Sequence, residues 1–463
     1  MDYILALDQG TTSSRAVGFD HAGQPVAMAQ REFTQYFPRP AWVEHDALDI
    51  WRSQFAVMQA AMAQVGISAH QLRAIGLTNQ RETTVLWDRQ TGQPVAPAIV
   101  WQDRRTADIC AAMKAQGEEP VVQAKTGLLL DPYFSGSKIG WALENWPQLR
   151  DAGAHLAVGT VDSYLVARLT NGASHITDAS NASRTQLCNI ETANWDDELL
   201  SIFNVPRSAL ATIVPNYGHL AETDPQSFLG IKAPITGMAG DQQAALIGQA
   251  FFSPGMVKST YGTGCFMIQN TGDQPVSSKN RLLTTVGYRL DGKVTYAVEG
   301  SIFVAGAAVQ WLRDGIKLIS HARDTEAMAE QTGDACGVYL VPAFTGLGAP
   351  YWRPELKAQW SGLTLGTGKA QLARAVLEAV AYQTADLLQA MRADGAALLS
   401  LQVDGGMVNN SWFCQFLANV LDINVMRPLQ TETTAFGVAL LAGIQLGWYA
   451  DLDALPDLVR AES

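Results

Sequence analysis

The stretch "LALDQGTTSSR", residues 5–15, begins as an apolar run and ends in an acid, a glycine and four hydroxyl side chains. We expect a buried strand over Tyr3–Leu7, a second over Ala16–Phe19 and, beyond a turn at residues 21–24, a third over Pro25–Ala29. The polar turn therefore joins two strands. Familiar phosphate loops lie between a strand and a helix instead, with the spacing G-x-x-x-x-G-K-[ST] or G-x-G-x-x-G, and this stretch has neither.

The second half of the chain repeats this opening. Residues 255–272, "GMVKSTYGTGCFMIQNTG", again predict a strand, a Gly/Thr turn and a strand. Residues 288–300 predict a hairpin with Asp-Gly at its turn, and a helical run follows over Phe303–Leu312. Two halves that begin alike indicate an internal duplication with a cleft between the halves. We place the boundary within residues 248–255, which divides the chain into domains 1–250 and 251–463.

Between the two openings, helical stretches alternate with short apolar runs. Helical spacing covers Ala47–Val65, residues 74–88 predict strand, polar loop and strand, and residues 159–172 predict a helix that ends at Asn171-Gly172. This alternation predicts an α/β layered domain.

Length, charge and cysteine content exclude several classes of protein. The 463 residues suffice for two large domains, and 44 acidic against 32 basic residues give a formal charge of −12, which disfavours a nucleic-acid partner. The five cysteines are scattered and never spaced as Cys-x-x-Cys, so we expect reduced thiols rather than disulfides or a zinc site. Because we find neither a basic, signal-like N-terminus nor a bilayer-spanning apolar run, we expect a cytoplasmic protein without membrane insertion.

The two Gly/Thr turns are candidates for phosphate binding. Glycine lets the backbone approach an anion, and exposed N–H groups and hydroxyls donate hydrogen bonds to its oxygens. Alone, the first turn is equally typical of an ordinary hairpin, but a second turn in the matching place of the other half is hard to explain by chance. Asp8 could then hold Mg²⁺ directly or through water, although a turn-forming aspartate explains it as well. A late turn, Asp404-Gly405-Gly406, could let a purine or ribose lie against the backbone, but by itself it indicates only a strand-to-helix turn.

Two further motifs supply groups for substrate chemistry. Asp241 begins an alanine-rich helix within residues 238–249, where the helix dipole favours the ionised carboxylate, so Asp241 could take a proton from an attacking hydroxyl. An ordinary N-cap role explains the same residue. Arg81 and Glu82 would point apart in a regular strand, so both reach one ligand only from an irregular loop. The alternative for this pair is a solvated ion pair on the surface.

Taken together, these motifs resemble the FGGY carbohydrate kinases over essentially the whole chain. The resemblance is carried, in family order, by "ALDQGTTSSRA", "WVEHD", "TNQRETT", "AIVWQDRRT", "TGLLLDPYFSGSK", "GTVDSYL", "TDASNASRT", "GDQQAALIGQ", "TYGTGCFM", "VPAFTGLGAPYW" and "VDGGMVNN". Residues 358–378 fit the C-terminal family signature, and residues 133–142 fit the N-terminal one apart from Ala142. The resemblance implies two duplicated ribonuclease H-like α/β domains around a central cleft, the fold of the actin, Hsp70 and sugar-kinase ATPases. It also implies phosphorylation of glycerol by ATP with Mg²⁺.

The resemblance assigns roles residue by residue. Asp241 would be the base that deprotonates the terminal hydroxyl, and Asp8 would act on Mg²⁺. The polyol would be hydrogen-bonded and covered by Arg81, Glu82, Tyr133, Asp241 and Gln242, with Trp101 and Phe266 as walls. The phosphates would be bound by Thr11, Thr12, Ser13, Arg15 and Thr263, and the nucleoside by Gly306, Gln310, Gly406 and Asn410.

Several positions depart from the family pattern. Arg353 stands where Asp is common, Lys357 falls in a segment that usually has Ala-Arg-Gly-Ala, and Asn419 replaces a usual Asp. We expect these changes to affect interdomain or subunit contacts rather than substrate choice. Residues 227–235 are shorter than the loop with which some bacterial relatives bind fructose bisphosphate, so we do not carry that regulation over.

Two alternatives stay open. The acceptor could be another small polyol or a ketose, such as dihydroxyacetone, erythritol or xylulose, unless Arg81, Trp101 and Phe266 close the pocket to three carbons. An actin- or Hsp70-like ATPase would need no acceptor site, and so gives no reason for "NQRET" and "GDQQ" to occur together. We expect a homo-oligomer, either a dimer or a tetramer.

Overall fold

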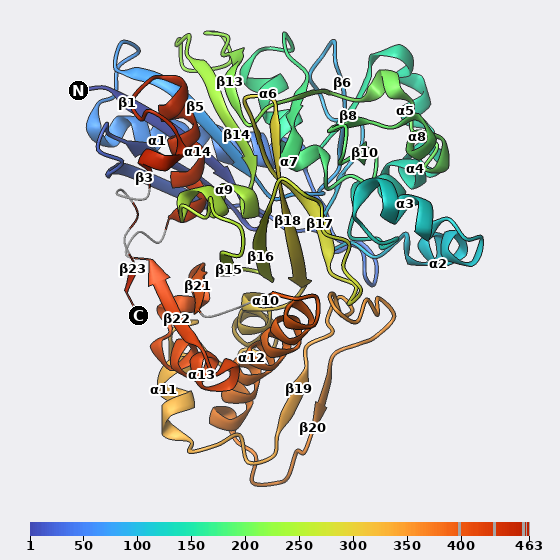
Figure 1. Cartoon of the computed structure of the whole chain (residues 1–463), viewed down its shortest axis with the longest axis vertical. Helices are drawn as coiled ribbons and strands as arrows, with labels where there is room; N and C mark the ends of the chain where they lie inside the picture. The colour runs from blue at the N-terminus through green and yellow to red at the C-terminus, as the bar shows by residue number, and fades with distance from the viewer. Residues whose placement is uncertain (397–399, 429–431, 456–458, 460, 463) are drawn as a thin grey trace.

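The computed structural model describes residues 1–396, 400–428, 432–455, 459 and 461–462. Within this part of the chain each half builds one large sheet (Figure 1). The six strands of the first sheet are, in spatial order, β13 (Tyr217–Glu222), β14 (Pro234–Gly240), β5 (Leu72–Asn79), β1 (Tyr3–Gln9), β2 (Ser13–Phe19) and β3 (Pro25–Glu32). The seven strands of the second are β17 (Leu283–Leu290), β18 (Lys293–Ile302), β16 (Cys265–Gly272), β15 (Val257–Tyr261), β21 (Ser400–Asp404), β22 (Asn424–Pro428) and β23 (Ala461–Glu462).

Five strands of each sheet share one topology. In the first sheet β1 is antiparallel to β2 and β2 to β3, whereas β1 is parallel to β5 and β5 to β14. In the second sheet β15, β16, β18, β21 and β22 take the same places with the same directions. The predicted fold, two duplicated α/β units, is thereby confirmed. At the edges, β13 extends the first sheet beyond β14, and β17 and β23 extend the second sheet beyond β18 and β22.

The strands and hairpins predicted from the turns are present. The meander is formed by β1, β2 and β3, and its strands run further than predicted because the β1–β2 ladder continues to the pair Gln9–Ser14. The β17–β18 hairpin turns at Asp291 and Gly292, whose φ angles of 49° and 76° suit a tight two-residue turn. The strand pair within residues 74–88 is β5 and β6 (Val85–Asp88).

The helix predicted over 303–312 is displaced. It starts as α10 (Gly306–Gln310) and continues as one π-helical turn over Trp311–Gly315. The reason is that the backbone N–H groups of Ala305 and Gly306 donate to the carbonyls of Thr263 and Gly262, both at 2.9 Å. The Gly/Thr turn of the second half therefore holds the chain that leads into this helix.

The predicted helix Ala47–Val65 is confirmed as α1 with the same bounds, since the Asp46 carboxylate caps its start and Gly66 ends it with a φ of 62°. The helix within residues 159–172 is α6 (Val161–Leu169). The remaining α-helices are α2 (Ala107–Ala115), α3 (Glu119–Thr126), α4 (Ser135–Asn145), α5 (Gln148–Asp151), α7 (Ala179–Ala182), α8 (Asp197–Ile202), α9 (Asp241–Gly248), α11 (Asp324–Gln331), α12 (Lys369–Ala393), α13 (Ser411–Leu421) and α14 (Thr433–Gln445). Short two-stranded ladders pair β4 (Glu44–His45) with β7 (Ala98–Ile99), β6 with β8 (Leu156–Gly159), β9 (Ile176–Asp178) with β12 (Thr212–Val214), β10 (Cys188–Asn189) with β11 (Asn194–Trp195), and β19 (Tyr339–Val341) with β20 (Gln359–Ser361).

Helix α14 returns from the second half to the first sheet. It packs on β1, β5 and β14 and crosses α9. The crossing is so close that a Cβ atom at Gly437 would lie 1.8 Å from the carbonyl oxygen of Ala244, so only glycine fits there. The division into domains 1–250 and 251–463 stays a prediction, and α14 shows that the late chain packs on the first sheet in addition to supplying strands to the second.

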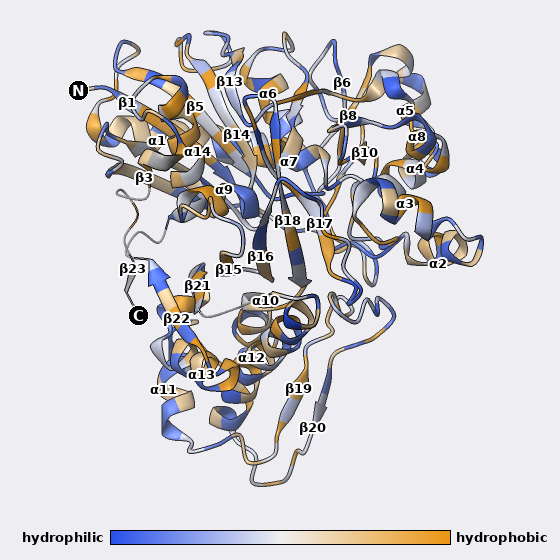
Figure 2. Ribbon diagram, in the orientation of Figure 1, coloured by the Kyte–Doolittle hydropathy of each residue, from blue (hydrophilic) through white to orange (hydrophobic). Residues whose placement is uncertain are grey.

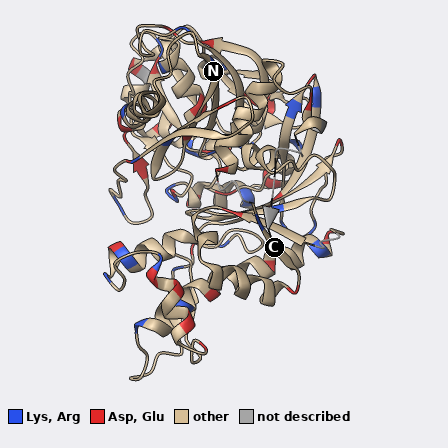
Figure 3. Ribbon diagram, turned by 90° about the vertical axis from the view of Figure 1, so that its left-hand side faces the viewer, with Lys and Arg blue, Asp and Glu red and all other residues tan. Residues whose placement is uncertain are grey.

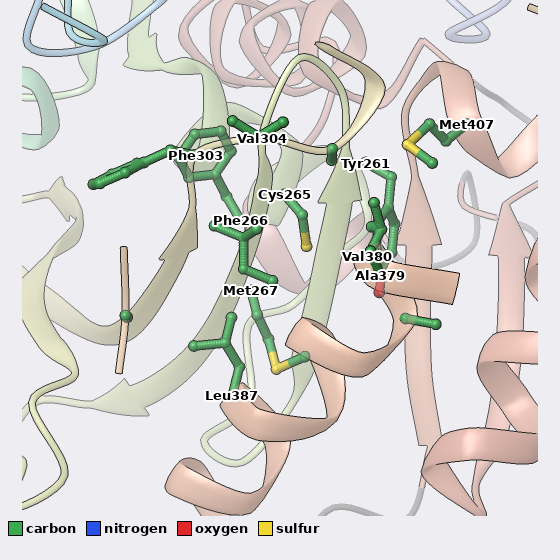
Figure 4. Packing of buried hydrophobic residues seen from close by; sticks show 14 of the residues in the cluster. Tyr261, Cys265, Phe266, Met267, Phe303, Val304, Ala379, Val380, Leu387 and Met407 are labelled. Carbon is green, nitrogen blue, oxygen red and sulfur yellow. The ribbon is translucent and has the colours of Figure 1, made fainter. Parts of the chain in front are cut away.

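Apolar side chains form the interior of both halves. They are frequent along the strands and along α14 (Figure 2), and in the second half Leu387 of α12 reaches Met267 near Cys265 and Phe266 (Figure 4). Acidic and basic residues are interspersed over both halves (Figure 3). The five cysteines are free thiols, as predicted. None of the helices in the described ranges combines the length and apolar character needed to cross a bilayer.

Candidate active site

Two connected hollows lie where the sheets of the two halves approach each other. The smaller, about 220 Å³, is here called the narrow hollow, and the larger, about 460 Å³, the wide hollow. They share Thr12, Arg15, Gly262, Thr263 and Gly406, so they form one continuous cleft. The predicted site residues that line only the narrow hollow are Asp8, Thr11, Arg81, Glu82, Trp101, Tyr133, Asp241, Gln242 and Phe266, and those that line only the wide hollow are Ser13, Gly306, Gln310 and Asn410.

The structure therefore brings all the predicted site residues to one cleft. A separate hollow of about 770 Å³, near Tyr36 and Pro97, contains none of them.

The two Gly/Thr turns lie at the junction of the hollows. The first is closed by the Gly10 N–H, which donates to the Ser13 carbonyl at 3.0 Å. Its Thr11 hydroxyl accepts a hydrogen bond of 2.9 Å from the indole N–H of Trp101, which ties this turn to a wall of the narrow hollow. The second turn holds Gly306 through the Gly262 carbonyl. Glycines and threonines of both turns thus line the junction from the two halves, and such residues suit the binding of a phosphate chain.

The late glycine pair has two distinct roles. Gly405 has a φ of 93°, and a Cβ atom there would lie 2.5 Å from the carbonyl oxygen of Tyr261, so glycine is needed for packing on the second turn. Gly406 meets no atom within 4 Å in the direction of a Cβ and lines both hollows. A flat group can therefore approach the backbone at Gly406 rather than at Gly405.

Arg81 and Glu82 follow β5 in an irregular loop. Glu82 has a φ of 60°, which turns its side chain toward the same side as that of Arg81. Their side chains are only 1% and 2% exposed, so the alternative of a solvated surface ion pair is wrong. Arg81 Nε lies 3.2 Å from Asp241 Oδ1, and its Nη2 lies 3.4 Å from the Tyr133 hydroxyl.

Asp241 is the first residue of α9, and the N-cap position belongs to Gly240. The N-cap alternative is therefore wrong for the Asp241 side chain, which lines the narrow hollow. Burial raises the pKa of Asp241 to about 6, while Arg81 lowers it and Glu82 raises it further. At the start of the helix we expected the ionised form of Asp241 to be favoured, but the effect of burial on its pKa is larger. The raised pKa makes this carboxylate a stronger base than a free aspartate.

Aromatic rings wall the narrow hollow. The Trp101 ring lies 5.7 Å from that of Tyr133 and 5.6 Å from that of Phe266, centroid to centroid, both edge to face. The Arg81 guanidinium carbon lies 5.5 Å from the Phe266 ring centre. Apolar walls and charged groups therefore face the same small space, which suits a ligand with carbons on one side and hydroxyls on the other.

Asp8, at the end of β1, is the predicted metal contact. Burial raises its pKa to about 6, Arg15 at 3.8 Å lowers it, and Glu432 raises it. Among the described residues no group of three or more His, Cys, Asp or Glu side chains is placed to hold a metal ion. A Mg²⁺ ion bound mainly by phosphate oxygens and water needs only one or two carboxylates, so Asp8 fits that demand.

Three buried charged residues of the site were not predicted from the sequence. Arg184 follows α7, Glu299 lies in β18 and Lys258 lies in β15, and all three are buried. Lys258 Nζ donates to Gln242 Oε1 at 2.7 Å, which leaves the Gln242 amide nitrogen to donate to a ligand. Only Glu299 carried a signal in the sequence, as the one acidic residue within the strand run of residues 293–302, which is typical of a buried ion pair. Lys258 and Arg184 stand next to polar residues, which give no such signal.

The positions that depart from the family pattern lie elsewhere. Arg353, Lys357 and Asn419 are exposed and line neither hollow. Arg353 pairs with Glu355, and Asn419 accepts a hydrogen bond from Gln415 at 3.0 Å. They do not touch the residues predicted to hold the polyol.

The duplicated sheets and the cleft between them define the ATPase fold that sugar kinases share with actin and Hsp70. The family model described as the N-terminal domain of the FGGY family of carbohydrate kinases matches residues 3–248, and that of the C-terminal domain matches residues 257–446. The chain therefore belongs to the FGGY family of carbohydrate kinases.

Named relatives are similar over nearly the whole chain. The glycerol kinase of Ectopseudomonas mendocina is 64% identical over 459 residues, which cover 98% of this chain and 92% of that protein. Glycerol kinase 1 of Pseudomonas aeruginosa is 61% identical over 453 residues, which cover 97% of this chain and 92% of that protein. The solved structure of Plasmodium falciparum glycerol kinase with ADP has a TM-score of 0.86 and 35% identity, and the match covers 100% of this chain and 93% of that one.

Proposed function

We propose that this protein transfers the terminal phosphoryl group of ATP to glycerol, forming sn-glycerol 3-phosphate and ADP. The observation that carries the proposal is the convergence of Arg81, Glu82 and Asp241 with three aromatic rings in a hollow of about 220 Å³ that opens onto the two Gly/Thr turns. Relatives at 64% and 61% identity that bear the name glycerol kinase support the same acceptor.

Asp241 is proposed as the general base. With a pKa of about 6 the carboxylate is ionised at neutral pH, and it can accept the proton of the attacking terminal hydroxyl. The Arg81 guanidinium, 3.2 Å away, holds the carboxylate in place and keeps it charged. Removing the proton as the hydroxyl attacks in line is the one covalent task that phosphoryl transfer leaves to the protein.

The acceptor is proposed to lie between charges and rings. Arg81, Glu82 and Gln242 would hydrogen-bond its hydroxyls together with Tyr133, while Trp101 and Phe266 would cover its carbons. Because these polar groups are buried, a ligand that lacks a hydroxyl would leave one of them without a partner. This arrangement supports glycerol over larger acceptors, since the aromatic walls limit the space.

The nucleotide is proposed to extend from the wide hollow into the narrow one. Thr12, Arg15 and Thr263 line both hollows, so a phosphate chain held there would present its terminal phosphate to the acceptor. The nucleoside would lie along Gly306, Gln310, Gly406 and Asn410. Mg²⁺, held at Asp8, would neutralise phosphate charge.

A panel of acceptors tests the proposal. ADP release would be measured with glycerol, dihydroxyacetone, erythritol and xylulose, and we expect the highest kcat/KM for glycerol. A higher value for one of the others would replace the acceptor, and ATP hydrolysis that none of the four stimulates would favour an actin- or Hsp70-like ATPase. The cytoplasmic location and the homo-oligomeric state also stay proposals, to be tested by cell fractionation and by light scattering of the purified protein.

A further inference from the structure

A buried ring of four charges lies behind the narrow hollow. It consists of Arg81, Glu82, Arg184 and Glu299, whose side chains are at most 2% exposed. Glu299 accepts hydrogen bonds from Arg81 Nη1 at 2.5 Å and Nη2 at 3.0 Å, and from Arg184 Nη2 at 2.8 Å. Arg184 Nε in turn donates to Glu82 Oε1 at 2.7 Å, and Arg81 Nε lies 3.9 Å from the same Glu82 oxygen, which completes the ring.

Only half of this ring reaches the cleft. Arg81 and Glu82 line the narrow hollow, whereas Arg184 and Glu299 line neither hollow. Arg81 and Glu82, which face the hollow, are therefore each hydrogen-bonded to a residue that does not line it. Two parallel hydrogen bonds from one guanidinium to one carboxylate fix the plane of Arg81, which a single ion pair would not do.

The two supporting residues come from different halves. Arg184 follows α7 of the first half, and Glu299 lies in β18 of the second sheet. The Ser301 hydroxyl holds Glu299 with a hydrogen bond of 2.9 Å, and although burial would raise its pKa, Arg184 and Arg81 lower it to about 2. Glu299 is therefore a permanent anion that the second sheet places against two arginines of the first half.

We propose that Glu299 and Arg184 are positioning residues for the acceptor, and that they make the acceptor contacts of the first half depend on the docking of the second sheet. Glu299 fixes Arg81 directly. Arg184, which is itself hydrogen-bonded to Glu299, fixes Glu82. The inference rests on the proposed function, because it assigns Arg81 and Glu82 to the acceptor. A purely structural ring would hold the halves together without a specific effect on acceptor binding.

The test is steady-state kinetics of Glu299→Gln, which keeps the shape of the side chain and removes its charge. We expect the KM for glycerol to rise on the order of 10- to 100-fold, while the KM for ATP changes less than about threefold, because only acceptor contacts lose their support. The matched control is Glu378→Gln. It removes the same charge from the largely buried pair of Arg374 and Glu378 within α12. Neither residue of this pair lines a hollow, so both KM values should stay unchanged.

A second variant keeps the proposal testable if Glu299→Gln does not fold, since removing one partner of a buried ion pair can be strongly destabilising. Arg184→Lys keeps the charge but cannot donate to Glu82 and Glu299 through separate nitrogens of one rigid fork. We expect the KM for glycerol to rise about tenfold, again without a matching rise for ATP. If the folded variants leave the KM for glycerol unchanged, or raise both KM values equally, the positioning role is wrong. If the wild-type protein does not phosphorylate glycerol in the same assay, it is the proposed function that fails.

Discussion

The two hollows of the cleft differ in the groups that line them. The narrow hollow is formed by side chains whose charges are buried and fixed by ion pairs, such as Arg81 against Asp241 and Glu299. The wide hollow, about twice as large, is lined by the backbone of the second turn and Gly406, by apolar side chains such as Val309, and by charged side chains such as Arg313 and Glu326 that are partly exposed to water. Buried charges that are already fixed in position discriminate strongly against a ligand that lacks the matching polar groups. Contacts to the backbone and to exposed side chains bind a larger ligand with less discrimination.

The largest expected effect comes from removing one hydroxyl of the acceptor. 1,3-Propanediol keeps both terminal hydroxyls, so the reacting group is present, but it lacks the central one. We expect kcat/KM to fall on the order of 10⁴-fold relative to glycerol, because a buried polar group of the narrow hollow is left without a partner. Initial rates at varied acceptor concentration measure this.

The matching change at the other end of the cleft is 2′-deoxy-ATP in place of ATP. It also removes one hydroxyl, but from a ligand that we propose to lie in the wide hollow. We expect kcat/KM to fall less than about tenfold, because the groups there are more exposed to water. Equal losses for the two changes would contradict the contrast between the hollows.

The second-largest effect is expected for the variant Asp241→Asn, which changes a side chain of the narrow hollow. The amide cannot accept the hydroxyl proton, so we expect kcat to fall on the order of 10³-fold. The dissociation constant of ADP, measured by calorimetry, should change less than about twofold, because Asp241 lines only the narrow hollow. Asp162→Asn is the control, since Asp162 is an aspartate of the first half that is buried and lines neither hollow, and this variant should retain the wild-type kcat.

The residues that form the wide hollow were easier to predict from sequence than the supports of the narrow one. Glycine and hydroxyl clusters such as residues 10–14 are local signals, and their occurrence in both halves predicted the duplicated sheets. Arg81 and Glu82 were recognised as a pair, but Glu299, the partner of Arg81, lies 218 residues further along the chain. No local pattern encodes such a contact.

The same limit explains what else was missed or displaced. The start of α10 is delayed because Ala305 and Gly306 bond to a turn about forty residues earlier, which the helical spacing of residues 303–312 does not reveal. The return of α14 to the first sheet depends on its fit against α9 at Gly437, which is a property of two packed helices rather than of either sequence. Local chemistry was predictable, and the contacts between distant segments were not.

A smaller effect concerns stability, and it also belongs to the narrow hollow. The pKa of Asp241 in the folded protein, about 6, lies above its ordinary value of 3.8, so between these pH values the unfolded chain releases a proton that the folded protein retains. The free energy of unfolding therefore falls as the pH rises through this window. Asp241→Asn should stabilise the protein at pH 8 by about 1–3 kcal/mol and have little effect near pH 4, because the neutral amide carries no desolvation cost. Thermal unfolding of both proteins at the two pH values measures this, and an Asn variant that is less stable at pH 8 would show that the Arg81 contact outweighs burial.

The smallest effect is expected at the rim of the wide hollow. Asn410 caps α13 by accepting a hydrogen bond from the Phe413 N–H at 2.8 Å, and its amide nitrogen donates to the Thr325 hydroxyl at 3.3 Å. Asn410→Ala should lower the free energy of unfolding by about 1 kcal/mol through loss of the cap, and should raise the KM for ATP about threefold. Asn410→Asp retains the cap acceptor but not the amide donor, so it should keep the stability of the wild type while the KM for ATP still rises. If that variant instead raised the KM for ATP by about 100-fold, the wide hollow would depend on a preset side chain as strongly as the narrow one does, and the distinction between the two ends of the cleft would be lost.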